Sequence, residues 1–303
     1  MINKVHWAFF GSSRFSVYVL DELKQHGMLP NLLITIPDRP KGRKMILTPN
    51  EVRVWGQKNN IEVFDPETLR SERGSNAEEF LRNTEVKFGD WDLFLVASYG
   101  KIIPKEIFEI PKHKTLNIHP SLLPKYRGAS PIQSQILNND TEVGVSIMQI
   151  EEAMDTGPIV IQKPLPNPSP CQGEEQGTKG AWGEVGRKEL EKILAIEGAG
   201  LFAHILPEWL LGAIDPIIQN EDKATYCQKI KKEDGFLDLS DNPLKNLLKI
   251  KAFEEWPTSY YFNKEKRIII TDATIEDDKL KILKIIPEGK KEMLYEDFLR
   301  GNK

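Results

Sequence analysis

Three side chains in this sequence have the chemistry of an acyl-transfer site: an asparagine amide, a histidine imidazole and an aspartate carboxylate. Asn117 and His119 lie two residues apart, and Asp155 opens a short Asp-Thr-Gly-Pro motif. A carboxylate can orient a histidine ring, and the histidine can move a proton. An asparagine amide can hydrogen-bond the oxyanion that develops on a transferred carbonyl group. Because no serine or cysteine is obviously placed as a nucleophile, the pattern favours direct attack by an acceptor amine.

Each motif also has a purely structural interpretation. A His-Pro pair after Leu-Asn-Ile could simply end a strand, and Asp-Thr-Gly-Pro is ordinary turn chemistry. Short motifs are weak evidence singly, with roughly one chance in five that any one of these residues is catalytic. The adjoining string Ser121–Gly128 has no evident packing rationale, so the combination favours a functional site.

The elements that must position these residues read as a Rossmann-like α/β fold. A helix is predicted over 14–26, and buried strands are predicted over 5–10, 32–36, 92–97, 115–118 and 143–148. Strands that alternate with helices indicate a mostly parallel sheet covered on both faces. Ligands of such sheets bind beyond the carboxyl ends of the strands. Asn117 and His119 lie at one of these ends.

Composition describes an ordinary soluble protein. The 303 residues are 40% hydrophobic and 28% charged, which suits two globular domains. The net charge of −4 argues against indiscriminate nucleic-acid binding. No apolar run approaches the roughly 20 residues that span a bilayer, and the start lacks a signal-peptide pattern. Cys171 and Cys227 have no metal-ligand spacing, so we expect a cytoplasmic protein with no metal and no membrane partner.

A local basic cluster stands out against this charge balance. Arg39, Lys41, Arg43 and Lys44 are opposed only by Asp38. The structural interpretation is a solvated loop, since Gly and Pro make the segment poorly suited to a helix or a strand.

The chain changes character in its second half. A Pro- and Gly-rich stretch at about 164–186 reads as an inserted loop, followed by a helix over 187–211. We expect a catalytic domain at 1–205, a linker at 206–222 and a C-terminal β domain at 223–303. In that last part a helix is predicted over 243–252 and short strands over 259–262, 267–271 and 279–283.

The stretch Asn117–Gln133, NIHPSLLPKYRGASPIQ, resembles the folate-dependent formyltransferases, and the resemblance covers most of the chain. It extends to Phe9-Phe10-Gly11, to PDRPKGRK at 37–44, to ASYGKIIP at 97–104, to Val145–Pro158, to Trp256-Pro257 and to PEGKK at 287–291. The basic loop and the tail motifs narrow the resemblance to the branch that acts on methionyl-tRNA. The family carries an OB-like β-barrel at the C-terminus, but the span Asp272–Leu280 is short here, so the barrel is expected to be reduced.

The resemblance implies transfer of a formyl group from 10-formyltetrahydrofolate to the α-amino group of initiator methionyl-tRNA, by a monomer. By this resemblance, Asn117 hydrogen-bonds the formyl oxygen, and His119 stabilises the tetrahedral intermediate or moves its proton. Asp155 orients the histidine ring. The implied folate contacts are Ser121, Leu122, Leu123, Pro124, Lys101, Ile102 and Ile103. The implied tRNA contacts are Arg39, Lys41, Gly42, Arg43 and Lys44.

Three rival functions remain open. A sugar-nucleotide N-formyltransferase would share the three catalytic residues but would have no use for the basic loop. A 10-formyltetrahydrofolate hydrolase would use water as the acceptor. A folate- or RNA-binding module without activity would not need a proton-transfer pair.

Overall fold

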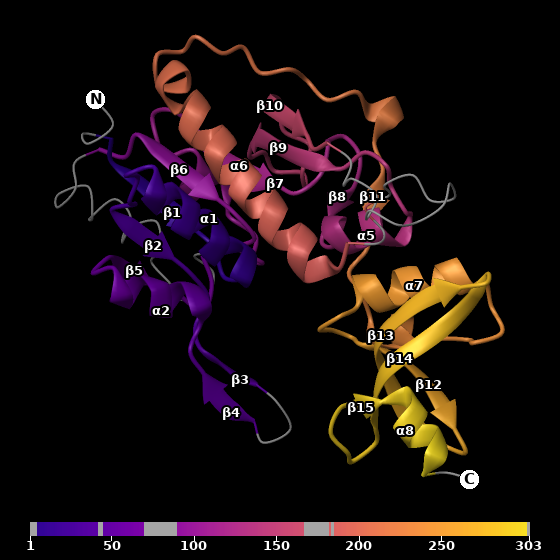
Figure 1. Ribbon diagram of the computed structural model, residues 1–303. Helices are drawn as coiled ribbons and strands as arrows, with labels where there is room; N and C mark the ends of the chain where they lie inside the picture. Colours follow the sequence, from indigo (N-terminus) through magenta and orange to yellow (C-terminus); the bar gives the residue numbers. More distant parts are fainter. Residues whose placement is uncertain (1–4, 42–44, 70–89, 167–181, 183–184, 302–303) are drawn as a thin grey trace. The chain divides into compact units, whose positions relative to one another are not determined.

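The computed structural model describes residues 5–41, 45–69, 90–166, 182 and 185–301, which form two compact units (Figure 1). The first unit comprises Met1–Arg127, Gly144–Lys163 and Lys192–Ala224, and the second comprises Gly128–Val143, Pro164–Glu191 and Thr225–Lys303. The last segment of the second unit starts close to the predicted boundary at 223. The second unit also takes in two earlier stretches, so the predicted domain limits remain a proposal. Most of the predicted insertion at 164–186 lies outside the described residues.

A seven-stranded sheet forms the centre of the first unit. In spatial order its strands are β10 (Ile159–Pro164), β9 (Gly144–Gln149), β7 (Thr115–His119), β6 (Leu93–Val96), β1 (Trp7–Phe10), β2 (Leu32–Ile34) and β5 (Glu62–Phe64). The pairs β5–β2, β2–β1, β1–β6 and β6–β7 are parallel, whereas β7 and β9 are antiparallel. The strand order reverses beside β1, as in doubly wound folds. The predicted α/β, Rossmann-like class is confirmed.

Helices and loops cover both faces of this sheet because its strands are apolar on both sides. Among the described residues, the helices that precede the C-terminal segment of the second unit are α1 (Arg14–Gln25), α2 (Glu51–Lys58), α4 (Lys105–Phe108), α5 (Pro131–Leu137) and α6 (Arg187–Leu210). Figure 1 shows α6 running across one face, where Phe202 packs 6.3 Å from the ring of Trp7. Ile107 of α4 belongs to the core on the opposite face, with Phe10 and Phe94.

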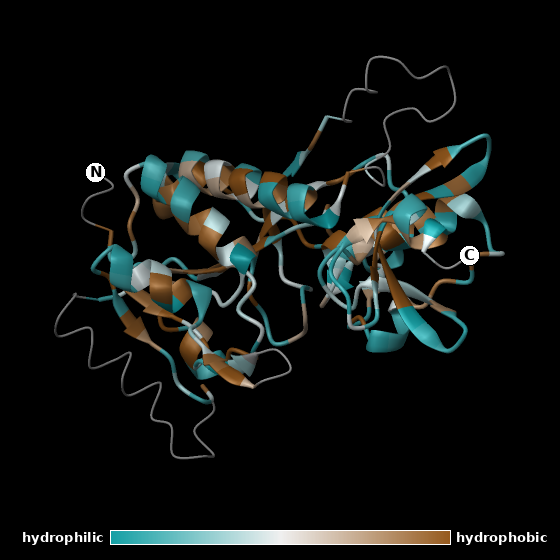
Figure 2. Cartoon of the chain, turned by 60° about the horizontal axis from the view of Figure 1, so that its bottom comes forward, coloured by the Kyte–Doolittle hydropathy of each residue, from teal (hydrophilic) through white to brown (hydrophobic). Residues whose placement is uncertain are grey.

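Helix α6 contains many apolar residues, and Figure 2 shows brown turns alternating with white and teal ones in the helices of this unit. By length and composition alone it could cross a membrane, and it is the one such helix among the described residues. Its residues nevertheless serve as core: Leu194, Ala195 and Ala199 are fully buried. The sequence prediction, which found no apolar run of that length, missed this feature.

The C-terminal segment of the second unit folds around an antiparallel sheet. Its elements are α7 (Pro243–Ala252), β12 (Ser259–Asn263), β13 (Lys266–Glu276), β14 (Lys279–Pro287), β15 (Met293–Leu294) and α8 (Tyr295–Arg300). The four strands pair in sequence order, consistent with a small barrel-like domain. Strand β13 is longer than predicted because Asp277 and Asp278 both adopt left-handed backbone angles and close a two-residue hairpin turn.

Two further local predictions need correction. The segment around Arg39 is not a plain loop, since β3 (Arg39–Lys41) and β4 (Ile46–Thr48) form an antiparallel hairpin. Proline is tolerated there because the hairpin is isolated from the large sheet and both strands are edges. Helix α2 was also missed, although Asn50 caps it by accepting hydrogen bonds from Val52 N and Arg53 N. The remaining short elements are β8 (Arg127–Gly128), β11 (Tyr226–Cys227), and the 3₁₀ turns Glu221–Lys223 and Lys232–Gly235.

Candidate active site

The end of β7 presents Asn117 and His119 on the same face of the sheet, because side chains two residues apart in a strand point the same way. The intervening Ile118 points to the other face, where Gly198 of α6 meets it so closely that a Cβ there would lie 2.5 Å from Ile118 Cγ2. Close packing of α6 against Ile118 therefore fixes the direction in which the two polar side chains project.

The structure brings His119 and Asp155 together. Nδ1 of His119 lies 3.7 Å from Oδ1 of Asp155, which is an ion-pair distance rather than a hydrogen bond. Nε2 of the same ring lies 3.0 Å from the carbonyl oxygen of Tyr126. His119 is buried, with 4% of its surface exposed, so water competes little for either ring nitrogen.

Both ring nitrogens of His119 face oxygen atoms, Nε2 at hydrogen-bond distance and Nδ1 at ion-pair distance, so the ring is oriented from both sides. Asn117 is half-buried at the same strand end and adds an amide donor. The group can therefore stabilise an oxyanion beside a positioned proton carrier, which is the chemistry that acyl transfer needs.

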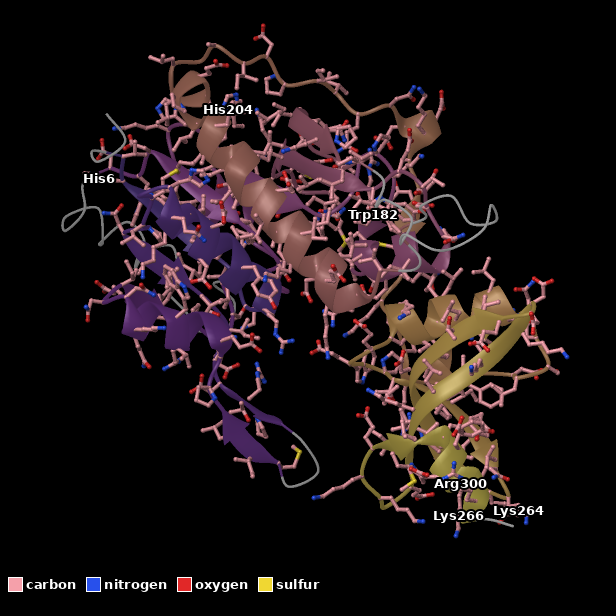
Figure 3. All side chains as sticks on the ribbon, in the orientation of Figure 1. His6, Trp182, His204, Lys264, Lys266 and Arg300 are labelled. Carbon is pink, nitrogen blue, oxygen red and sulfur yellow. The ribbon has the colours of Figure 1, made fainter. Side chains whose placement is uncertain are left out.

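Other histidines do not share this environment. His6 precedes β1 and His204 lies on α6, where Figure 3 labels them. His26, which follows the last residue of α1, pairs with Glu22 of that helix at 3.3 Å. Among the described residues, no group of three or more His, Cys, Asp or Glu side chains is placed to hold a metal ion.

The turn that carries Asp155 is tightly constrained. Asp155 has a φ of 56°, a left-handed conformation uncommon for a residue with a side chain. Two residues later, a Cβ on Gly157 would lie 2.0 Å from the carbonyl oxygen of Gln149 on β9. Gln219 donates hydrogen bonds to the carbonyl oxygens of both Asp155 and Gly157. Sequence reasoning missed Gln219, which no local motif marks.

The predicted folate segment Ser121–Pro124 follows β7 directly. Ser146 of β9 holds it: its hydroxyl donates to the carbonyl oxygen of Ser121 at 2.5 Å and accepts from Leu123 N at 3.0 Å. Leu123 is buried against Met148 and Ile159, whereas Leu122 is half-buried. Leu123 therefore serves the core, and the segment as a whole is fixed by its backbone.

The second predicted folate segment, Lys101–Ile103, follows β6. Lys101 Nζ donates to the carbonyl oxygens of Pro66 (3.0 Å) and Glu67 (2.6 Å). Burial lowers the pKa of this amine, with Glu67 opposing the change. Ile102 is 65% exposed and Ile103 packs on the core. The lysine side chain is thus engaged by the protein, and the exposed isoleucine is the one available to a ligand.

The described part of the predicted tRNA segment, Arg39–Lys41, forms strand β3, which pairs with β4. Arg39 pairs with Glu67 at 3.0 Å, and Lys41 ends β3. Gly42, Arg43 and Lys44 lie outside the described residues. The hairpin also exposes three apolar side chains that the prediction overlooked: Met45, Ile46 and Leu47 are each more than 60% exposed.

Comparison with known proteins identifies relatives along almost the whole chain. The formyl transferase family matches residues 4–167. A methionyl-tRNA formyltransferase of Thermodesulfovibrio yellowstonii is 32% identical over 97% of this chain and 95% of the relative. One of Dictyoglomus thermophilum is 33% identical over 97% of this chain and 96% of the relative.

Solved structures agree with this at the level of the fold. The methionyl-tRNA formyltransferase of Clostridium thermocellum aligns with a TM-score of 0.56 at 17% identity, over 96% of this chain and 99% of the other. An N-formyltransferase of Helicobacter canadensis, in complex with folinic acid and dTDP-3-aminofucose, aligns with a TM-score of 0.59 at 18% identity, over 90% and 88%. At such identities the likeness concerns the fold alone.

Proposed function

Since this chain belongs to the formyl transferase family and matches methionyl-tRNA formyltransferases over 97% of its length, we propose that it formylates initiator methionyl-tRNA with 10-formyltetrahydrofolate as the donor. The reaction transfers the formyl group to the α-amino group of the esterified methionine and serves translation initiation. We place this activity in the cytoplasm and assign it to a monomer.

The observation that supports the proposal is the pairing of His119 with Asp155, with Asn117 two residues before His119 on β7. The amine attacks the formyl carbon directly, and the carbonyl oxygen becomes an oxyanion. The Asn117 amide donates a hydrogen bond to that oxygen, a contact whose loss typically costs about 10²–10³ in rate. His119 stabilises the tetrahedral intermediate or moves its proton, with its ring oriented by Asp155. When the intermediate collapses, the bond between the formyl carbon and N10 of the folate breaks, and N10 takes a proton as the attacking amine loses one.

The donor would lie between two segments that follow neighbouring strands. Ser121–Pro124 comes after β7 and Lys101–Ile103 comes after β6, and these strands are paired in the sheet. Backbone groups of both segments and the exposed side chain of Ile102 would contact the pterin end of the folate. A folate co-substrate is consistent with the folinic acid bound to the Helicobacter canadensis N-formyltransferase.

The acceptor would be recognised by the β3–β4 hairpin. Arg39 and Lys41 offer charge to phosphates, and Met45, Ile46 and Leu47 offer apolar surface to an unpaired base. Of the residues predicted here, Arg43 and Lys44 complete the basic set, and Gly42 precedes them. Binding through phosphates should weaken as salt rises.

The test measures product with competing acceptors. The protein is incubated with 10-formyltetrahydrofolate and charged initiator or elongator methionine tRNA, and N-formylmethionine is detected after hydrolysis of the ester. We expect formylation of the initiator species and its loss in His119→Ala. Because sugar N-formyltransferases share the fold, a nucleotide amino-sugar is offered in parallel. Formylation of that sugar instead of the tRNA would contradict the proposal.

A further inference from the structure

A network of hydrogen bonds, buried at Arg127 and Gln219, joins the segment after α6 to the turn that carries Asp155. Gln219 Nε2 donates to the carbonyl oxygens of Asp155 (2.8 Å) and Gly157 (2.7 Å). Gln219 Oε1 accepts from Arg127 Nε (3.0 Å) and Nη2 (2.9 Å). Arg127 also pairs with Glu221, through Nη1–Oε2 at 2.8 Å and Nη2–Oε1 at 2.7 Å. All of these residues belong to the first unit.

Arg127 decides which end of the Gln219 amide faces the turn. A guanidinium group only donates hydrogen bonds, so the amide oxygen must face it. The amide nitrogen is then left to donate to the two carbonyl groups. If the amide turned over, Arg127 would face another donor and both carbonyl oxygens would face another acceptor. Only one orientation of the Gln219 amide therefore gives every donor and acceptor around it a hydrogen-bond partner.

Burial of Arg127 is not explained by packing alone. Its surface is 0% exposed, and Gln219 is 5% exposed. Removing a charge from water is costly, and apolar side chains of similar volume often fill such a site with equal or better stability. The exposed Glu221 compensates the charge, and its hydrogen bond from Arg127 lowers the pKa of the Glu221 carboxyl group. What an apolar side chain could not do is orient the Gln219 amide.

The two groups that face the His119 ring, Tyr126 O and the Asp155 carboxylate, are each linked to this hydrogen-bond network. Tyr126, whose carbonyl oxygen faces His119 Nε2, immediately precedes Arg127. Asp155, which faces Nδ1, has its own carbonyl oxygen held by Gln219. A residue with a left-handed backbone keeps that conformation only when the surrounding structure holds it.

We propose that Arg127 and Gln219 are positioning residues for formyl transfer. The amide of Gln219, oriented by Arg127, holds the Asp155–Gly157 turn so that the carboxylate stays within reach of His119. This inference rests on the proposed function for its assay, but the contacts themselves concern Asp155 whatever amine is formylated.

Gln219→Glu is the most informative variant. A glutamate side chain still pairs with Arg127, but it cannot donate to the carbonyl oxygens of Asp155 and Gly157. We expect kcat to fall about 10²-fold, the effect typical of a misplacement of about 1 Å. We expect the KM values for donor and tRNA to stay close to those of the wild type, and the thermal midpoint to fall because two carbonyl oxygens lose their donor.

A double-mutant cycle separates positioning from a general effect on folding. In an Asp155→Asn background, measured by single turnover at high enzyme concentration, Gln219→Glu should cause little further loss, because the two residues act as one unit. Equal fold-losses in both backgrounds would overturn the proposal, as would a Gln219→Glu enzyme that keeps the wild-type kcat.

Two further variants keep the test decisive. Gln135→Leu removes another buried glutamine that donates to a backbone carbonyl oxygen, that of Pro131, in the second unit. It should lower the thermal midpoint and leave kcat unchanged.

If Gln219→Glu does not fold, Arg127→Lys replaces it, because lysine keeps the charge but lacks the two guanidinium nitrogens that donate together to Gln219 Oε1. The same loss of kcat is expected, and wild-type kcat would refute the inference.

The proposed function and this inference fail in different ways. If the wild type forms no N-formylmethionine but formylates an amino-sugar, the proposed function is wrong. The kcat of each variant relative to the wild type is then measured with that sugar. If the wild type formylates tRNA and Gln219→Glu does so equally well, only the positioning role is wrong.

Discussion

Replacing Gly157 by alanine should disable the site without touching a catalytic side chain. A Cβ at this position would lie 2.0 Å from Gln149 O and 2.9 Å from Gln149 C, and ordinary contact begins at 3.4 Å. To bring the 2.0 Å contact to the 3.4 Å of ordinary contact, the turn and β9 would have to separate by roughly 1.4 Å. Both contacts are backbone, so no side-chain rotation can relieve them.

The expected loss follows from the position of Asp155, two residues before Gly157. Its carboxylate already lies 3.7 Å from His119, and a shift of more than 1 Å would remove it from the ring. A displacement of that size typically costs about 10² in rate. Forcing a methyl group into the contact should also destabilise the fold by about 1–3 kcal/mol.

The assay is the initial rate of N-formylmethionyl-tRNA formation at saturating donor and acceptor, with a thermal melt to count folded enzyme. Gly200→Ala on α6 is the matched control, since its Cβ would meet no atom within 4 Å. Alanine should stabilise that helix by about 0.5–1 kcal/mol and leave kcat unchanged. A folded Gly157→Ala enzyme with kcat within about threefold of the wild type would refute the reasoning, because a loss near 10² is expected.

Three other predictions concern the surroundings of the site. Asn50→Ala should lower the free energy of unfolding by about 0.5–2 kcal/mol, because the cap of α2 is lost. It also removes the hydrogen bond between Thr35, before β3, and Asn50, after β4, which should loosen the hairpin, so that KM rises for tRNA but not for the donor. Because Arg127 lowers the pKa of Glu221, the pair stabilises the fold above the usual glutamate pKa, and this stability is lost as pH falls through the lowered value. Glu221→Gln should therefore lower the thermal midpoint at neutral pH and flatten its fall in acid, which a series of melts across pH would check. Tyr99→Phe should raise stability by about 1 kcal/mol in denaturant titration, since the buried hydroxyl has no hydrogen-bond partner among the described residues; an unchanged or lower value would contradict this.

Local pattern was enough to predict most of the strands and helices of the first unit. Apolar runs such as Leu93–Val96 predict buried strands whatever surrounds them, because their side chains must leave water on both faces. Helix α7 was predicted with its observed bounds, Pro243–Ala252, since proline starts a helix well and the apolar spacing continues behind it. The hairpin at Arg39–Thr48 was missed because its pairing lies outside the large sheet and leaves no apolar alternation.

The sequence by itself determined which chemistry was available: the amide and the imidazole two residues apart on one strand, the carboxylate in a turn, and the formyltransferase motifs around them. Only the tertiary structure decided what holds that chemistry in place. Gln219 reaches Asp155 across 64 residues and Arg127 across 92, and neither separation leaves a periodic signal in the chain. Such contacts form only when the sheet brings distant segments together, so their partners become visible only in the folded molecule.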